Sequence, residues 1–241
     1  MTNAQLNSYT QEIIASLKEY EDLERKTFAL ISYPTKLELL GVRNPDLKLV
    51  LKEVKVLSKE WPLQAKMDLA IGLINTGIME CVHLAFEYIG LEKKVLATFN
   101  ESHLPSFMKY MDNWVCTDTF GVHVLGVAWR NNQIKTSTIH KMASHSDFWI
   151  RRLALVATIP FNMRSRGGKG NTEQTLAVCE LLVADKHDMI VKALSWALRE
   201  LLEHDKDSVE KFLVKHEHVI HARVKRELKN KISTGKKNPN S

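Results

Sequence analysis

Helical periodicity along most of the 241 residues constrains the fold of this chain more than any other feature of its sequence. Apolar residues recur every three or four positions, as Ile190, Leu194, Ala197 and Leu201 do, which is the spacing of one face of an α-helix. No pair of alternating apolar runs flanks an Asn-Gly or Asp-Gly turn, so the sequence predicts no β-hairpin. Only 10 Gly and 6 Pro interrupt the chain, which favours helices over strands and turns. The predicted fold class is therefore all-α.

The predicted helices share this periodicity. They comprise one or two helices within Ala4–Ile31 (apolar positions Ile13, Leu17, Leu23 and Phe28), helices that begin near Pro45 and Pro62, and the segments Gly77–Ile89, Leu104–Asp112, Trp114–Gly126, Gln133–Ala143, Asp147–Thr158, Thr172–Ala184, Asp188–Glu203, Ser208–His216 and Val219–Ile232. Asn44 is expected to cap the helix at Pro45, and Ser146 or Asp147 is expected to cap the helix that follows them.

Two of these helices open with a similar quartet. Trp149-Ile150-Arg151-Arg152 and Met189-Ile190-Val191-Lys192 start about 40 residues apart, and Leu63-Gln64-Ala65-Lys66 starts about twice that distance before Trp149. This period is typical of HEAT-like helix pairs, which stack into a curved solenoid with a concave inner surface. A plain helical bundle is the alternative. We expect a single domain over 1–232, followed by a disordered basic tail over 233–241.

Composition restricts the partners and the cellular setting. The net charge of +6 favours an anionic partner and indicates nucleic acid. The first residues do not have the pattern of a signal peptide, and no apolar stretch approaches the roughly 20 residues that span a bilayer. Cys81, Cys116 and Cys179 are expected to be buried, reduced thiols. We therefore expect a protein of the bacterial cytoplasm with no membrane partner.

Three side chains are the main candidates for chemistry. In a helix, Trp114 and Asp118 are four residues apart and lie on the same face. The alternative is a core tryptophan beside a capping or solvated carboxylate. Trp196 lies off the apolar stripe of its helix, on a flank with Lys192 and Arg199, and exposed large aromatic side chains usually have a partner. For Trp196, too, packing is the alternative.

Two further segments are rich in cations or histidines. The glycine-rich loop 164–171 lacks the spacing of a nucleotide P-loop; its Arg166 and Lys169 either reach a phosphate backbone or are simply solvated. The histidines at 216, 218 and 221 have no Cys or carboxylate at ligand spacing, so the sequence indicates no metal and no cofactor.

Four segments, taken in order and at their spacing, resemble the AlkD-like DNA alkylation repair enzymes, which are DNA glycosylases built from HEAT-like repeats. The segments are Leu40-Gly41-Val42 with Pro45, Trp114 with Asp118, Trp149-Ile150-Arg151-Arg152, and Ala193-Leu194-Ser195-Trp196-Ala197-Leu198-Arg199-Glu200. The resemblance covers the chain from about Tyr33 to Ile232. It implies that Trp114, Asp118 and Trp196 form an active-site cleft and that Arg152 contacts the DNA backbone near the lesion.

The resemblance further implies a monomeric base-excision-repair glycosylase. Its substrate would be double-stranded DNA that carries cationic N3- or N7-alkylated purines, and it would hydrolyse their N-glycosidic bond. The other residues predicted to contact DNA are Lys192, Arg199, Tyr33, Arg166, Lys169 and Arg223. Two alternatives stay open: a non-catalytic helical-repeat protein that binds damaged or branched DNA, and a protein-binding scaffold.

Overall fold

The computed structural model describes residues 1–238, and the chain divides between Val124 and Leu125 into two compact units, the N-terminal unit and the C-terminal unit. Helices account for the regular structure of both units. Within the described residues the only β-type pairing is one isolated parallel bridge between Glu38 and Ile78. The all-α helical-repeat fold predicted from periodicity is confirmed, while the curved solenoid with a basic concave face stays a prediction.

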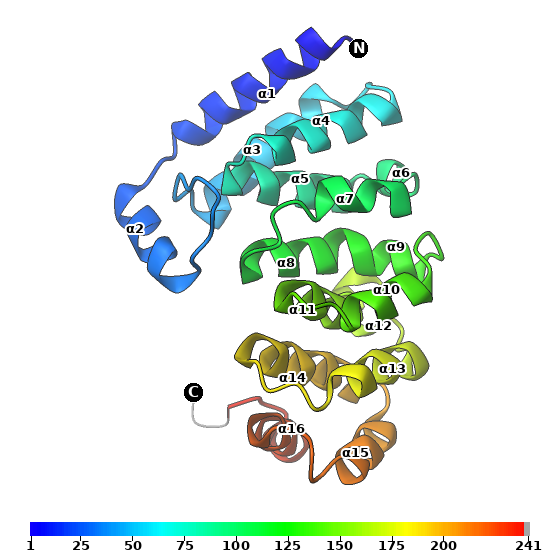
Figure 1. Ribbon diagram of the computed structural model, residues 1–241. Helices are drawn as coiled ribbons and strands as arrows, with labels where there is room; N and C mark the ends of the chain where they lie inside the picture. Colours follow the sequence, from blue (N-terminus) through cyan, green and yellow to red (C-terminus); the bar gives the residue numbers. More distant parts are fainter. Residues whose placement is uncertain (239–241) are drawn as a thin grey trace. The chain divides into compact units, whose positions relative to one another are not determined.

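The N-terminal unit consists of α-helices of 4 to 16 residues and a three-residue 3-10 turn (Figure 1). They are α1 (Asn3–Lys18), α2 (Leu23–Ser32), α3 (Asn44–Leu57), α4 (Leu63–Asn75), α5 (Met79–Leu91), α6 (Lys93–Leu96), the 3-10 turn η1 (Glu101–His103), α7 (Leu104–Phe107) and α8 (Trp114–Phe120). A π-helical turn, Gly121–Leu125, follows α8 and crosses into the C-terminal unit.

The core of the N-terminal unit forms around α5, which packs against α4, α3 and α8. Four aromatic rings meet there, with centroids 5.0–6.1 Å apart, and all four are buried: Phe86, Phe99, Phe107 and Phe120. The hydroxyl of Tyr88 forms a 2.7 Å hydrogen bond with that of Ser58, and burial raises the pKa of Tyr88 to about 12. Packing of this kind, rather than helix propensity, stabilises most helices in proteins.

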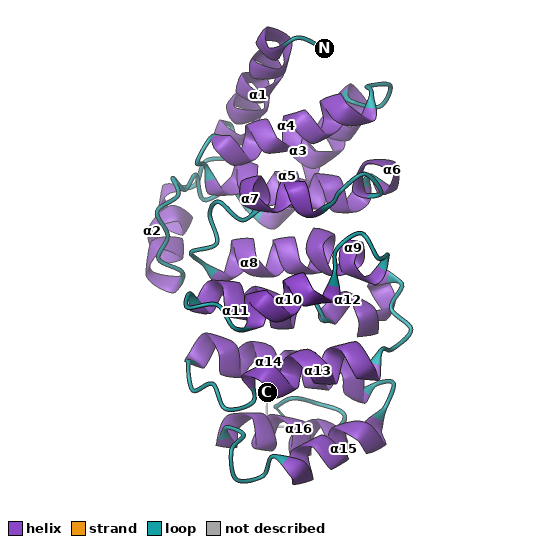
Figure 2. Ribbon diagram, turned by 45° about the vertical axis from the view of Figure 1, so that its right-hand side comes forward, coloured by secondary structure: helices purple, strands orange, loops and turns teal. Residues whose placement is uncertain are grey.

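The C-terminal unit stacks its helices in successive pairs (Figures 1 and 2). Its elements are α9 (Gly126–Arg130), α10 (Thr136–Ala143), α11 (Phe148–Val156), α12 (Ile159–Asn162), the 3-10 turn η3 (Arg164–Arg166), α13 (Thr172–Leu182), α14 (Asp188–Leu202), α15 (Lys206–Lys215) and α16 (Ala222–Thr234). Helix α10 packs on α11 and α13 on α14, while α14 packs on both α11 and α16. The similar quartets at Trp149 and Met189 thus lie in the first turns of two neighbouring helices.

Local capping explains several helix starts. Asp147 accepts the backbone N–H of Trp149 at 2.8 Å, which confirms one of the two caps proposed for α11. Asn44 is the first residue of α3 rather than its cap; Arg43 precedes it, and Pro45 lies in the first turn. A one-residue shift of this kind is common because Asn and Pro both tolerate several first-turn positions.

The structure differs from the predicted helices at several places. The segment Leu104–Asp112 is helical only to Phe107, and the short helices α6 and α12 were not predicted. Leu23 and Phe28, which were predicted as apolar positions of a helix, are 70% and 68% exposed. Ala29 is the one buried residue of α2. Helix α16 continues through Ser233 to Thr234, both of which were predicted to belong to the tail. Residues 239–241 of that tail lie outside the described residues.

All three cysteines are buried free thiols, as the sequence predicted. Burial raises the pKa of Cys81 and of Cys116 to about 12 and also raises the pKa of Cys179, so none of them is a reactive thiolate. Among the described residues, no helix has the length and apolar character needed to cross a membrane.

Candidate active site

The start of α8 at Trp114 sets the positions of Trp114 and Asp118 on the helix. The Asn113 side chain accepts the backbone N–H of Cys116 at 2.9 Å, and its backbone carbonyl accepts the Thr117 hydroxyl at 2.8 Å. This cap makes Trp114 the first helical residue and puts Asp118 one turn later on the same face. Trp114 is 40% exposed, although most tryptophans in proteins are largely buried.

A pocket of about 230 Å³ in the N-terminal unit contains both side chains. Arg25, Tyr33, Glu80 and His83 are among the other residues that line it. The rings of Tyr33 and Trp114 meet edge to face, with centroids 5.6 Å apart and planes at 83°. Burial raises the pKa of Tyr33 above its ordinary value, so the phenol is neutral at pH 7. We call this site the aromatic–carboxylate pocket; it comprises Tyr33, Trp114, Asp118 and their neighbours.

Asp112, which lies just before α8, fixes the segment after Tyr33 beside Trp114. Tyr33 ends α2, its N–H donating to the Ala29 carbonyl, and Pro34 prevents the helix from continuing. The carboxylate of Asp112 then accepts the hydroxyl of Thr35 and the backbone N–H of Lys36, both at 2.7 Å. These bonds join two segments that are far apart in the sequence, and so they bring the two rings together.

Glu80 is a residue of the pocket that the sequence analysis did not single out. Its carboxylate accepts the backbone N–H groups of Leu40 at 3.0 Å, Gly41 at 2.7 Å and Val42 at 3.3 Å. Gly41 has φ +82°, and a Cβ there would lie 2.3 Å from the Asp22 carbonyl oxygen, so only glycine fits. The Leu40-Gly41-Val42 segment is therefore held by a buried carboxylate. A lone Glu in the otherwise apolar start of α5 was the available sequence signal.

His83 lies one turn after Glu80, and its Nε2 is 3.5 Å from Glu87 Oε1. The hydrogen bond from His83, followed by the charges of His83, His123 and Lys48, lowers the pKa of Glu87 despite its burial. The Glu87 carboxylate therefore stays ionised and orients the His83 imidazole at the edge of the pocket.

The third residue proposed for catalysis, Trp196, lies on α14 in the C-terminal unit. It is partly buried, and its indole N–H donates to Glu200 Oε1 at 3.0 Å. Arg199, one turn from Trp196, donates to the Ser195 hydroxyl at 3.4 Å, and burial lowers its pKa. The indole and the guanidinium share one flank of α14, as the sequence predicted from their spacing.

The cations predicted to contact DNA differ in how firmly the protein itself holds them. Arg152 is buried, and its guanidinium donates to the Met189 carbonyl at 2.6 Å, which links α11 to the first turn of α14. Lys192 pairs with Asp188 at 2.7 Å on the surface of α14. Arg223 bridges Asp188 at 3.2 Å and Glu227 at 2.8 Å, and these carboxylates raise its pKa.

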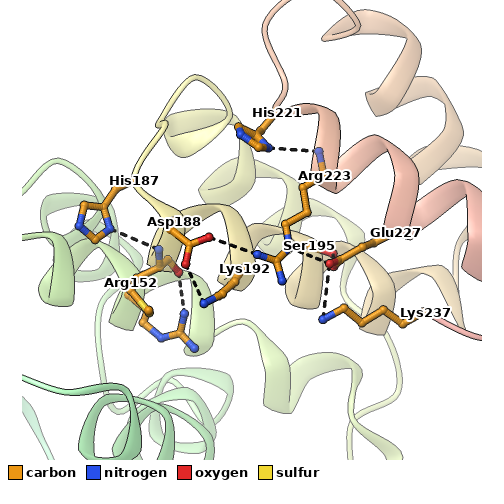
Figure 3. Close-up of polar contacts among 10 residues, drawn as sticks. Arg152, His187, Asp188, Lys192, Ser195, His221, Arg223, Glu227 and Lys237 are labelled. Atoms are coloured by element: carbon orange, nitrogen blue, oxygen red, sulfur yellow. Dashed lines mark hydrogen bonds and ion pairs between the residues drawn. The ribbon is translucent and has the colours of Figure 1, made fainter. Parts of the chain in front are cut away.

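Figure 3 shows the Arg152 contact between α11 and α14 and, beside it, a network of ion pairs between α14 and α16. Its centre is the buried Glu227, which also accepts the hydroxyl of Ser195 at 2.5 Å and faces Lys237 at 3.5 Å. Burial tends to raise the pKa of Glu227, but the hydrogen bonds from Arg223 and Ser195 and the charge of Lys237 outweigh it, and the pKa is lowered. Arg223 therefore has a structural role that its sequence context did not predict.

The basic loop 164–171 is folded rather than extended. Gly168 N–H donates to the Met163 carbonyl at 3.0 Å, and Gly170 N–H donates to the Phe161 carbonyl at 2.9 Å. Arg166 is partly buried in the turn η3, while Lys169 is exposed. Of the two predicted DNA contacts in this loop, Lys169 is thus the exposed one.

The described residues contain no group of three or more His, Cys, Asp or Glu side chains that could hold a metal ion. Two of the three C-terminal histidines, His216 and His221, have structural contacts. His216 Nε2 lies 2.8 Å from Glu180, and the ring of His221 accepts the N–H of Arg223 at the start of α16.

Paired helices in both units define a helical-repeat protein, and the pocket of the N-terminal unit brings the rings of Tyr33 and Trp114 together with the carboxylates of Asp118 and Glu80. The family model described as DNA alkylation repair enzyme matches residues 13–228, and the chain belongs to this family. The family resemblance inferred from the sequence is therefore confirmed, and it places the chain among enzymes of DNA repair. A search of curated proteins finds no match.

Proposed function

We propose that the protein is a DNA glycosylase that removes cationic N3- or N7-alkylated purines in base excision repair. The observation that carries the proposal is the aromatic–carboxylate pocket, in which Asp118 lies beside Trp114 and Tyr33. A carboxylate and two π faces all favour a positive charge. The lesion carries such a charge on its base, and the deoxyribose gains one as the glycosidic bond breaks.

The proposed reaction is hydrolysis of the bond between C1′ and the purine nitrogen. The bond electrons pass to the alkylated base, which leaves as a neutral molecule, so no acid is required. A water oxygen bonds to C1′ and its proton is released, which gives an abasic sugar. Sugar hydrolases need two carboxylates because they must also protonate the leaving group. A single carboxylate, Asp118, is sufficient here to stabilise the sugar cation and to orient the water.

The energies are adequate for this substrate class. A carboxylate a few ångströms from a unit positive charge contributes about 4 kcal/mol at an effective dielectric near 20, or about a thousandfold in rate. An indole face adds about 0.5–2 kcal/mol. These terms are too small to release an unmodified base, so selectivity for cationic lesions follows from the chemistry.

We propose that DNA binding is electrostatic and independent of sequence. Lys169 is exposed, and among the described residues Lys192 forms a surface ion pair with Asp188, which costs little to exchange for a phosphate. Arg152 and Arg223 have protein partners. A phosphate contact by Arg152 stays a prediction from the resemblance, and one by Arg223 stays a prediction from the positive charge of the C-terminal segment.

Release of 7-methylguanine or 3-methyladenine from methylated double-stranded DNA tests the proposal. We expect release by the unaltered protein, and we expect Asp118→Asn to keep DNA affinity while excision slows about a thousandfold. An unchanged excision rate in Asp118→Asn would overturn the mechanism. Salt-dependent DNA binding without release by the unaltered protein would instead indicate the non-catalytic DNA-binding alternative, and absence of both would favour the protein-binding scaffold.

A further inference from the structure

A second pocket of the N-terminal unit, of about 420 Å³, is rich in lysine. It lies where α3 ends, α4 begins and α5 leads into α6, and Lys59, Lys66, Lys93 and Lys94 line it. Glu80 and His83 of the aromatic–carboxylate pocket lie at the start of α5, whereas this pocket contains Leu91 at its end. Helix α5 has 13 residues, and at 1.5 Å per residue its two ends are about 18 Å apart, so the sites are separate. We call it the lysine pocket.

The cations of the lysine pocket exceed its carboxylates. Glu92 is already paired with Lys66 at 2.9 Å and lies 4.0 Å from Lys55, and Lys66 itself is buried. Lys93 and Lys94 are exposed and form no ion pair with any described residue. The remaining ion pair joins Lys59 and Glu60 at 3.8 Å. Their side chains are 80% and 88% exposed, so the pair contributes little interaction energy. The pocket therefore presents uncompensated positive charge.

Two further features suit a ligand with both an anionic and a flat apolar part. Trp61 forms part of the wall, is partly exposed, and is supported by Tyr9 with ring centroids 4.7 Å apart. Helix α4 starts at Leu63 without a side-chain cap, so the first backbone N–H groups of a 13-residue helix are left as donors beside the lysines.

We infer that the lysine pocket binds a nucleotide unit, its phosphate held by Lys93 and Lys94 and its base or sugar placed against Trp61. Lysine ammonium groups bind phosphate as point charges. Aromatic side chains beside cations are the usual means of holding nucleotides without sequence preference. The volume of about 420 Å³ falls in the range of small-ligand sites. The unit could belong to a free nucleotide or to a nucleic-acid strand, and the inference stands independently of base excision.

The test compares two double variants that each remove two exposed lysines from the N-terminal unit. Lys93→Ala/Lys94→Ala alters the lysine pocket; Lys18→Ala/Lys52→Ala is the control, because these lysines are exposed and lie outside the pocket. The probes are a fluorescent adenosine monophosphate and a labelled single-stranded oligonucleotide, with binding measured at two salt concentrations. We expect the pocket variant to bind at least one of the two probes about tenfold more weakly than the control variant does. Excision of alkylated bases should be unchanged, which separates this site from the proposed function.

The two probes distinguish the source of the nucleotide unit. An effect on the mononucleotide indicates a free nucleotide, and an effect on the oligonucleotide alone indicates a strand that extends beyond the pocket. Trp61→Leu should weaken nucleotide binding while leaving competition by inorganic phosphate unaltered. If the pocket variant binds both probes as tightly as the control does, the inference is wrong.

Discussion

The ring of Tyr33 meets the indole of Trp114 at 83°, with 5.6 Å between centroids, and neither helix propensity nor sequence spacing requires this contact. It exists because Asp112 ties the segment after Tyr33 to the start of α8. An edge-to-face pair of this kind contributes about 0.5–1.5 kcal/mol and limits the positions that the indole can occupy.

The contact leads to a prediction for Tyr33. Tyr33→Phe keeps the ring, so single-turnover excision should stay within about twofold of the unaltered rate. Tyr33→Ala removes the support of Trp114 and should slow excision by about 2- to 12-fold. The thermal midpoints of both variants serve as controls for folding. Equal excision rates in Tyr33→Ala and in the unaltered protein would show that the aromatic contact has no role in the reaction.

Trp196 yields a second prediction. Trp196→Ala should slow excision of cationic lesions by about 2- to 30-fold, which corresponds to the loss of one cation–π contact. The fold should survive, since Trp196 is only partly buried and lies off the apolar stripe of α14. Glu200→Gln is a matched control that keeps the indole but weakens its hydrogen bond. The packing alternative would be favoured if Trp196→Ala lowered the thermal midpoint by several degrees but left the excision rate unaltered at temperatures where the variant is folded.

Glu80 should matter for stability through the Leu40-Gly41-Val42 segment. Glu80→Ala leaves three backbone N–H groups without their carboxylate acceptor and should lower the free energy of unfolding by about 2–4 kcal/mol. Glu80→Gln retains one acceptor oxygen and should lower the free energy of unfolding by less than Glu80→Ala does. Urea unfolding of both variants measures the difference. An unaltered midpoint in Glu80→Ala would mean that the segment does not depend on this carboxylate.

The pH dependence of stability should reveal Glu227. Its pKa is lowered in the folded protein from the ordinary value of 4.5, so the folded state favours the charged form. The resulting stabilisation is complete above about pH 4.5 and is lost as the pH falls through the lowered pKa. Glu227→Gln should therefore be less stable than the unaltered protein by about 2–3 kcal/mol at pH 7, and the difference should shrink as the pH falls below 4.5 and through the lowered pKa.

Denaturant unfolding of both proteins over this pH range measures the effect of Glu227. Glu217→Gln is the control, because Glu217 is an exposed carboxylate of the same unit. A stability difference between Glu227→Gln and the unaltered protein that did not change with pH would contradict the charged role of Glu227.

Local sequence information predicted much of the helical structure. The cap at Asp147, the start of α14 at Asp188 and the shared face of Trp114 and Asp118 all depend on residues within one or two turns of each other. The end of α8 was not predicted. The helix expected to reach Gly126 instead passes into a π turn at Gly121, and such turns have no strong local signature.

The sequence by itself determined the all-α class, most helix positions, the buried cysteines and the membership of the DNA alkylation repair family. These features follow from periodicity, composition and motifs along the chain. Only the tertiary structure decided that Tyr33 contacts Trp114, that Glu80 holds the Gly41 segment, and that Arg152 and Arg223 are bound by the protein itself. The reason is that a cation or carboxylate has the same local pattern whether it faces solvent or a distant helix. Its partner is set by the long-range packing that brings the two together.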